Sequence, residues 1–211
     1  MIMKNFIKSN NKDLHIEKSY CYNFKDKALI RVEKNVPVSS LLKMYEGSTF
    51  NEGMFKIHTL GSSFFWTEIV TTFFNQYKNS CYCFGFDWMG RQFAYHDKDG
   101  KTKILMFDCS TAEVFEIEQT IDVFFDEDLV DYINETLDTE TFYAFKELNK
   151  IKNLSFKNCI SYITPLFLGG EDNLQNLEVI DMEVNWEVNY QVYCKIKDLP
   201  DQTLIKSISL K

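Results

Sequence analysis

The sequence predicts an α+β fold, in which helices pack on a mainly antiparallel sheet and the C-terminal half is rich in helix. Three observations support this class. The continuous apolar segment 81–86 is typical of a strand that is buried on both faces. Short apolar segments separated by turn residues follow it, which indicates a meander of neighbouring strands. Helical periodicity precedes this region at 66–77 and returns after residue 120.

The N-terminal part gives a weak pattern of elements. Residues 1–35 show little periodicity, and segment 16–32 is compatible with a strand or a short helix. Pro37 is favourable at the start of a helix, so we expect a short helix over 38–45. The apolar residues within 53–58 predict a strand.

The clearest helix follows Gly61, and its apolar residues recur at i, i+3, i+4 and i+7 on one face. Ser62 or Ser63 is a candidate N-cap, because a hydroxyl accepts a hydrogen bond from the first helical turn. Aromatic stripes of this kind usually pack in the core, and we expect the same here. The stripe consists of Trp66, Ile69, Val70, Phe73, Phe74 and Tyr77.

A central strand and a meander are predicted next. Segment 81–86 is followed by Asp87, Gly90 and Arg91, which favour a tight bend. We interpret Asp87 and Arg91 as a buried ion pair that shapes this bend, with a contact surface as the alternative. A hairpin turn is predicted at 97–100, where Gly100 permits positive φ. The returning strands are expected at 91–96, 103–107 and 113–118.

After residue 120 the apolar period becomes helical. A helix is predicted over 129–137, with a strongly acidic opposite face. Asp138 is a candidate N-cap for a second helix. We expect this second helix to bury Phe142, Phe145 and Leu148.

The last third of the chain contains one ambiguous segment. A strand is predicted at 159–163, and a loop at 164–176 contains a Gly169–Gly170 pair where side chains would clash. Segment 181–197 alternates as a strand does, and it also carries an apolar stripe at helical spacing. Alternation over 204–210 predicts a final strand.

Two domains or one compact unit are both compatible with 211 residues. We divide the chain into 1–118 and 119–211, where the strand pattern gives way to the helical one. No stretch rich in Pro, Gly or Ser separates these segments, so we expect a fixed interface between them.

The net charge restricts the class of partner. The chain has 23 basic and 31 acidic residues, for a formal net charge of −8. An acidic surface repels nucleic acid and anionic membranes and attracts basic proteins, although simple solubility also explains it. No apolar run approaches the roughly 18–20 residues that span a bilayer, and the N-terminus lacks a signal-peptide pattern. We therefore expect a cytoplasmic protein that binds neither nucleic acid nor membrane.

Six cysteines without a signal peptide predict free buried thiols rather than a disulfide framework. Cys81 and Cys83 are two residues apart, a spacing closer than zinc sites use, and no second ligand pair accompanies them. The glycines form no dinucleotide or phosphate fingerprint. We expect no metal and no cofactor.

No catalytic motif is evident. The histidines at 15, 58 and 96 form no metal-binding or catalytic pattern. His96 with Asp87 and Asp97 could be drawn as a hydrolytic site, but a strand end and a turn explain these residues more simply. Cys109 lies in a predicted turn without an evident base. We therefore name no catalytic residue.

Two parts of the chain carry a family resemblance. The first comprises 83–94 (CFGFDWMGRQFA) and 106–114 (MFDCSTAEV), and the second comprises 165–177 (PLFLGGEDNLQNL), 181–186 (DMEVNW) and Gln191. Together they resemble the bacterial type VI secretion immunity protein family, in which a GAD-like N-terminal domain precedes a C-terminal immunity domain. The resemblance covers roughly residue 38 to the C-terminus. At two positions this chain departs from a frequent family glycine, namely Ala112 and Gln202.

The resemblance implies a GAD-like domain over 1–118, an immunity domain over 119–211 and a helix within 181–197. It also implies a non-enzymatic protein that binds and blocks a cognate protein toxin, which is a DNase in one branch of the family. A cytosolic scaffold or regulatory binding module without a toxin partner is the alternative.

A nuclease toxin would present a basic groove, because phosphate contacts dominate nucleic-acid affinity. The densest acidic stretch, 122–140, is therefore the first candidate for a partner surface, with a merely solvated helix face as the alternative. A shorter acidic pair in the loop 164–176 is the second candidate. The candidate partner-binding residues are Asp126, Glu127, Asp128, Asp131, Glu135, Glu171 and Asp172.

Overall fold

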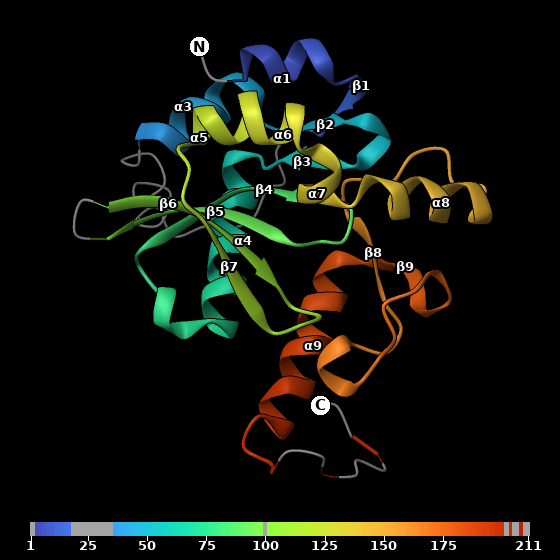
Figure 1. Ribbon diagram of the computed structural model, residues 1–211. Helices are drawn as coiled ribbons and strands as arrows, with labels where there is room; N and C mark the ends of the chain where they lie inside the picture. The colour runs from blue at the N-terminus through green and yellow to red at the C-terminus, as the bar shows by residue number, and fades with distance from the viewer. Residues whose placement is uncertain (1–2, 18–35, 99–100, 201–202, 204–206, 209–211) are drawn as a thin grey trace.

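The computed structural model describes residues 3–17, 36–98, 101–200, 203 and 207–208. Within these ranges, the larger sheet has seven antiparallel strands whose order follows the sequence, and a separate two-stranded hairpin lies beside it. Helices cover both faces of the larger sheet, so the molecule is layered as helix, sheet and helix (Figure 1). The predicted α+β class is confirmed.

The meander predicted after residue 80 is confirmed, and further strands precede it. The larger sheet contains β1 (Lys12–Ile16), β2 (Ser48–Phe50), β3 (Phe55–Ile57), β4 (Cys81–Asp87), β5 (Gln92–Lys98), β6 (Lys101–Asp108) and β7 (Glu113–Ile117). The hairpin contains β8 (Asn158–Tyr162) and β9 (Leu177–Asp181). The strand predicted at 53–58 is shorter than expected, because a 3-10 turn occupies Asn51–Gly53.

The helices group by the sheet face that they cover. One face is covered by α1 (Lys4–Ser9), α3 (Val36–Tyr45), α5 (Ile121–Val123), α6 (Leu129–Asp131), α7 (Ile133–Leu137) and α8 (Thr139–Asn149). The other face is covered by α4 (Leu60–Phe73) and α9 (Met182–Ile196). The ambiguous segment 181–197 is thus a helix, as the resemblance implied. Most of segment 16–32 and of the predicted strand 204–210 lies outside the described residues.

Side chains alternate between the two faces and build a separate hydrophobic cluster on each. On β5 and β6, Phe93 and Ile104 belong to the cluster beneath α5 and α6, whereas Ala94 and Leu105 belong to the cluster beneath α4 and α9. The first cluster contains residues from both sides of position 118, so hydrophobic packing continues across the predicted domain boundary. The division into two domains stays a prediction.

A β-bulge in β4 interrupts this alternation. The register with β5 shifts between Cys83 and Gly85, so Phe86 turns to the same face as Cys83, while Phe84 packs in the opposite cluster. A Cβ on Gly85 would lie 2.7 Å from the Lys56 carbonyl oxygen, which excludes any larger residue at this close approach. The bulge gives both faces of the central strand a phenylalanine.

Helix α4 begins earlier than the sequence suggested. Its N-cap is Thr59, whose hydroxyl accepts a hydrogen bond from the Ser62 N–H at 3.0 Å. The Ser62 hydroxyl accepts in return from the Thr59 N–H at 2.9 Å, which completes a capping box. Ser62 is therefore the third helical residue rather than the cap, and the Ser63 hydroxyl instead donates to the Cys83 carbonyl.

Helix α8 begins after Asp138, whose carboxylate accepts a hydrogen bond from the first turn at 3.3 Å, as predicted. Leu148, however, is 65% exposed, so the prediction that it is buried is wrong. At 3.6 residues per turn, position 148 lies about 120° around the helix from Phe142. Lys146 occupies the buried face instead, and its ammonium contacts the Glu52 carboxylate.

Candidate protein-binding surface

The acidic segment is a broken helix rather than the single helix predicted over 129–137. After α5, a π-helical turn over Phe124–Asp128 leads into α6, and Tyr132 (φ −127°, ψ 31°) separates α6 from α7. The wider turn lets the adjacent rings of Phe124 and Phe125 both enter the core, where each is 0% exposed. Tertiary packing of these two rings therefore sets the shape of the segment.

Asp126 is half-buried and faces α1. Its carboxylate accepts hydrogen bonds from the backbone N–H groups of Lys4 at 3.1 Å, Asn5 at 2.8 Å and Phe6 at 3.1 Å. The N-cap position of α1 is Met3, which provides no side-chain hydrogen bond. Asp126 supplies the missing acceptor, so this predicted partner-binding residue is already engaged within the molecule.

The remaining carboxylates of the segment face outward. Glu127, Asp131 and Glu135 are exposed and Asp128 is half-buried. Partial burial, and then the nearby Glu127, raise the pKa of Asp128 above its usual range. Tyr132 lies among them with 59% of its surface exposed. We call these five residues the acidic surface.

The backbone under the acidic surface is held at both ends. Asp126 fastens its start to α1, and at its end the Trp88 indole N–H donates to the Leu137 carbonyl at 2.6 Å. Arg91 donates to the neighbouring Thr136 carbonyl at 3.4 Å. Contacts at both ends fix the geometry of the surface before any partner arrives.

Asp87 and Arg91 form the ion pair that the sequence predicted, with 2.5 Å between Oδ2 and Nε. The Asp87 side chain is fully buried, and its other oxygen accepts from the backbone N–H groups of Met89 and Arg91, each at 3.0 Å. Burial raises the pKa of Asp87, and the guanidinium of Arg91 opposes that shift. The pair closes the bend between β4 and β5 and positions Arg91 beneath α7.

The second predicted acidic site lies elsewhere in the molecule. Glu171 and Asp172 are exposed on the loop between β8 and β9, which Figure 1 shows well separated from α5 and α6. Asp172 accepts a hydrogen bond from the Tyr162 hydroxyl at 2.6 Å, and Glu171 accepts from Asn173 at 2.7 Å. The structure therefore does not bring the two predicted acidic sites together.

The loop that carries this second site needs both of its glycines. Gly169 has φ 82°, and a Cβ on Gly170 would lie 1.9 Å from the Thr164 carbonyl oxygen. The predicted steric clash is thus confirmed at Gly170.

Comparisons with known proteins bear on the fold. No protein-family model matches the chain, and no curated protein matches it. Among solved structures, the chain is similar to "Crystal structure of Atu4351 from Agrobacterium tumefaciens", with a TM-score of 0.60 and 14% sequence identity. The similarity covers 90% of this chain and 89% of that chain. At this identity it shows the fold alone.

The hydrolytic triad that could be drawn from the sequence is not assembled. His96 pairs with Cys81 across β4 and β5, six residues along β4 from Asp87, which is about 20 Å in an extended strand. Within the described ranges, no three His, Cys, Asp or Glu side chains are placed so that they could hold a metal ion together. None of the helices in those ranges has the length and apolar character needed to span a bilayer.

The described cysteines match the expectation of free thiols. Cys81, Cys83, Cys109 and Cys159 are buried as predicted, whereas Cys194 is exposed, so the prediction that it is buried is wrong. Burial raises the pKa of the Cys159 thiol to about 12. A thiol with so high a pKa is a packing group rather than a nucleophile.

Sequence reasoning missed two features of the acidic surface. The inward role of Asp126 depends on a helix more than a hundred residues earlier in the chain, so no local pattern marks it. The exposure of Tyr132 follows from the break between α6 and α7. No Gly or Pro occurs at this break, so the sequence does not predict it. The only local sign is that the apolar residues at helical spacing in this segment are Leu129, Val130, Ile133 and Leu137, and Tyr132 is not among them.

Proposed function

We propose that the protein is an immunity protein that binds a cognate bacterial toxin and neutralises it by direct contact. The acidic surface carries this proposal, because exposed carboxylates flank the exposed Tyr132 in the sequence, on a backbone held at both ends. Tyrosine is enriched at the energetic centres of protein interfaces, and a fixed backbone loses little conformational entropy on binding. The sequence resemblance supplies the class of partner.

The proposed mechanism contains no chemical step by this protein. A nuclease toxin needs a basic groove to hold phosphates, and a basic groove attracts a net charge of −8. The carboxylates of Glu127, Asp131 and Glu135 would compete with phosphate for that groove. The toxin is then neutralised because its nucleic-acid substrate is excluded from the groove. We place the complex in the cytoplasm, where the toxin would meet its target.

The decisive experiment uses the gene beside this one. Its product is expressed in a bacterial host alone and together with this protein, and growth is measured with and without induction. We expect toxicity alone, rescue on co-expression and a stable complex of the two purified proteins. A harmless neighbour would overturn the proposal, as would a toxic neighbour that this protein neither binds nor suppresses. A bound but harmless neighbour would indicate a regulatory module instead.

A further inference from the structure

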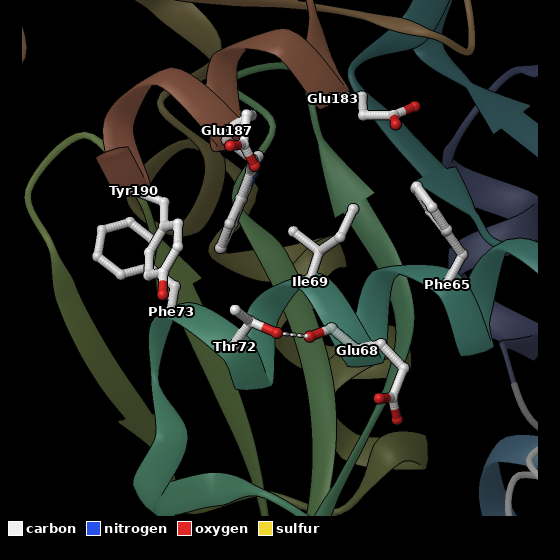
Figure 2. Close-up of a pocket in the computed structure, with 9 residues that line it drawn as sticks. Phe65, Glu68, Ile69, Thr72, Phe73, Glu183, Glu187 and Tyr190 are labelled. Atoms are coloured by element: carbon white, nitrogen blue, oxygen red, sulfur yellow. Dashed lines mark hydrogen bonds between the residues drawn. The ribbon is translucent and has the colours of Figure 1, made fainter. Parts of the chain in front are cut away.

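A groove of about 460 Å³ lies between α4 and α9, on the opposite face of the sheet from the acidic surface. Figure 2 shows Ile69 and Phe73 projecting from α4 toward α9, with Tyr190 beside Phe73. The Phe73 and Tyr190 rings are 5.5 Å apart, and Trp186, which is 1% exposed, lines the groove as well. Aromatic and aliphatic side chains therefore form most of its wall.

The charged residues that line this groove are all glutamates. Glu68 stands on α4, and Glu183 and Glu187 stand on α9 on the other side (Figure 2). The Glu187 carboxylate accepts a hydrogen bond from Gln191 at 2.6 Å, which helps to fix its position. Neither Lys nor Arg occurs among the lining residues, all of which belong to the described part of the chain. These residues are Phe65, Glu68, Ile69, Thr72, Phe73, Glu183, Trp186, Glu187 and Tyr190.

The spacing of the wall residues suits a helical ligand. Phe65, Ile69 and Phe73 follow one another at four-residue intervals along α4, a ridge about 12 Å long at 1.5 Å per residue. Such a ridge packs into the groove between side chains of a neighbouring helix. Two turns of a guest helix match this length, and the apolar side chains on its inner face would enter the groove.

We propose that this groove binds an amphipathic helix of a partner protein, with apolar residues at i and i+4 and with Lys or Arg on either side of them. The apolar wall selects the inner face of that helix, because burial of the partly exposed Ile69 and Phe73 removes apolar surface from water. The three glutamates favour a partner helix that carries Lys or Arg beside its apolar residues, because carboxylates on both sides of the groove attract cationic side chains and repel anionic ones. The binding mode is that of a helix in a groove. The inference is independent of the proposed toxin, which would meet the opposite face.

The test uses a labelled 16-residue helical peptide that has leucines at i and i+4 and arginines beside them, together with a twin in which glutamate replaces arginine. Binding to the full chain is followed by fluorescence anisotropy at two salt concentrations. We expect the arginine peptide to bind saturably and more weakly at high salt, and the glutamate peptide to bind at least tenfold more weakly. Equal binding of the two peptides, or no saturable binding of the arginine peptide, would overturn the proposal.

Two variants locate the site. Glu68→Lys/Glu187→Lys should weaken arginine-peptide binding at least tenfold, while Glu147→Lys/Glu178→Lys, which changes the net charge equally at exposed positions outside the groove, should retain it within twofold. Circular dichroism checks that both variants are folded. Equal losses in both would mean that net charge alone attracts the peptide, which contradicts a groove site. Analytical sedimentation of the wild type and of Ile69→Asn tests whether the protein self-associates. If the wild type self-associates and Ile69→Asn does not, a second copy of this chain fills the groove, and the proposal is overturned.

Discussion

The carboxylate of Asp126 lies 2.8 Å from the backbone nitrogen of Asn5, 121 residues earlier in the chain. The first N–H groups of a helix have no intrahelical acceptor, and they carry the positive end of the helix dipole. Asp126 meets both requirements for α1, and Met3 at the N-cap position meets neither. One residue of an acidic run thus fastens the N-terminal helix, while its neighbours remain free to face a partner.

Asp126→Ala should lower the free energy of unfolding by about 0.5–2 kcal/mol, the range observed when a helix loses its capping acceptor. Urea denaturation measures this change. Glu127→Ala is the matched control, since Glu127 is exposed and surface changes usually stay within about 0.5 kcal/mol. Equal losses in the two variants would contradict the capping role.

The elements that the sequence predicted well are those whose signals are local. The meander through β5, β6 and β7 combines alternating apolar residues with turn residues, and the structure keeps these strands within two residues of the expected bounds. The cap at Asp138 is equally local. Local patterns suffice where the partner of each group lies a few residues away.

The features that escaped prediction depend on distant packing. The π-helical turn exists because Phe124 and Phe125 both enter a core built by strands far earlier in the sequence. The aromatic stripe of α4 was expected in the core, and Trp66 is buried, but Ile69 and Phe73 line the groove that α9 leaves open. The residues of α4 alone do not indicate where α9 packs, so the exposure of Ile69 and Phe73 could not be predicted from them.

Lys56 is fully buried, and burial lowers its pKa to about 8. Its ammonium lies 3.4 Å from the Asn158 carbonyl oxygen and 5.1 Å from the centre of the Phe86 ring. Below pH 8 the folded protein holds a desolvated charge, so we expect Lys56→Met to raise the free energy of unfolding at pH 7 by roughly 2 kcal/mol, after the lost ring contact is subtracted.

The pH dependence gives this prediction its sign. Unfolded Lys56 binds its proton up to its ordinary pKa of 10.5, whereas the folded form releases it near pH 8. Between these values the unfolded state binds more protons, so the contribution of Lys56 to wild-type stability rises with pH. The advantage of Lys56→Met should therefore shrink between pH 7 and pH 10 in urea titrations. Lys152→Met, at an exposed position, is the control for the loss of one positive charge, and a constant advantage of Lys56→Met would contradict the assignment.

Arg91→Met should lower the free energy of unfolding by about 3–5 kcal/mol, because it leaves the fully buried Asp87 carboxylate without its partner. The double variant Asp87→Asn/Arg91→Met removes both charges and should recover part of that loss. Guanidinium denaturation of the three proteins gives the comparison. A double variant no more stable than Arg91→Met would show that the loss arises from packing rather than from an unpaired charge.

Ala112 adopts φ 59° in the turn between β6 and β7, the left-handed conformation that glycine tolerates best. An L-residue is strained there by about 1 kcal/mol, so Ala112→Gly should raise the free energy of unfolding by about 0.5–1 kcal/mol. Ala144→Gly in the middle of α8 is the opposite control, since glycine there should lower stability by about 1 kcal/mol. Thermal unfolding of both variants is the measurement, and a loss at position 112 would contradict the strain argument.

The acidic surface makes the last prediction, which applies to the toxin identified by co-expression. Glu127→Lys/Asp128→Lys/Asp131→Lys should slow association about tenfold or more at low salt and flatten its salt dependence, because steering by opposite charge acts mainly on the association rate. The fold should survive, since Glu127 and Asp131 are exposed while the buried Leu129 is untouched. Surface plasmon resonance at several salt concentrations measures the rate, and Glu113→Lys/Glu147→Lys/Glu178→Lys supplies the same charge change elsewhere. If the acidic-surface variant is folded and associates at the wild-type rate, the contact lies elsewhere, and the loop with Glu171 and Asp172 is the next surface to reverse.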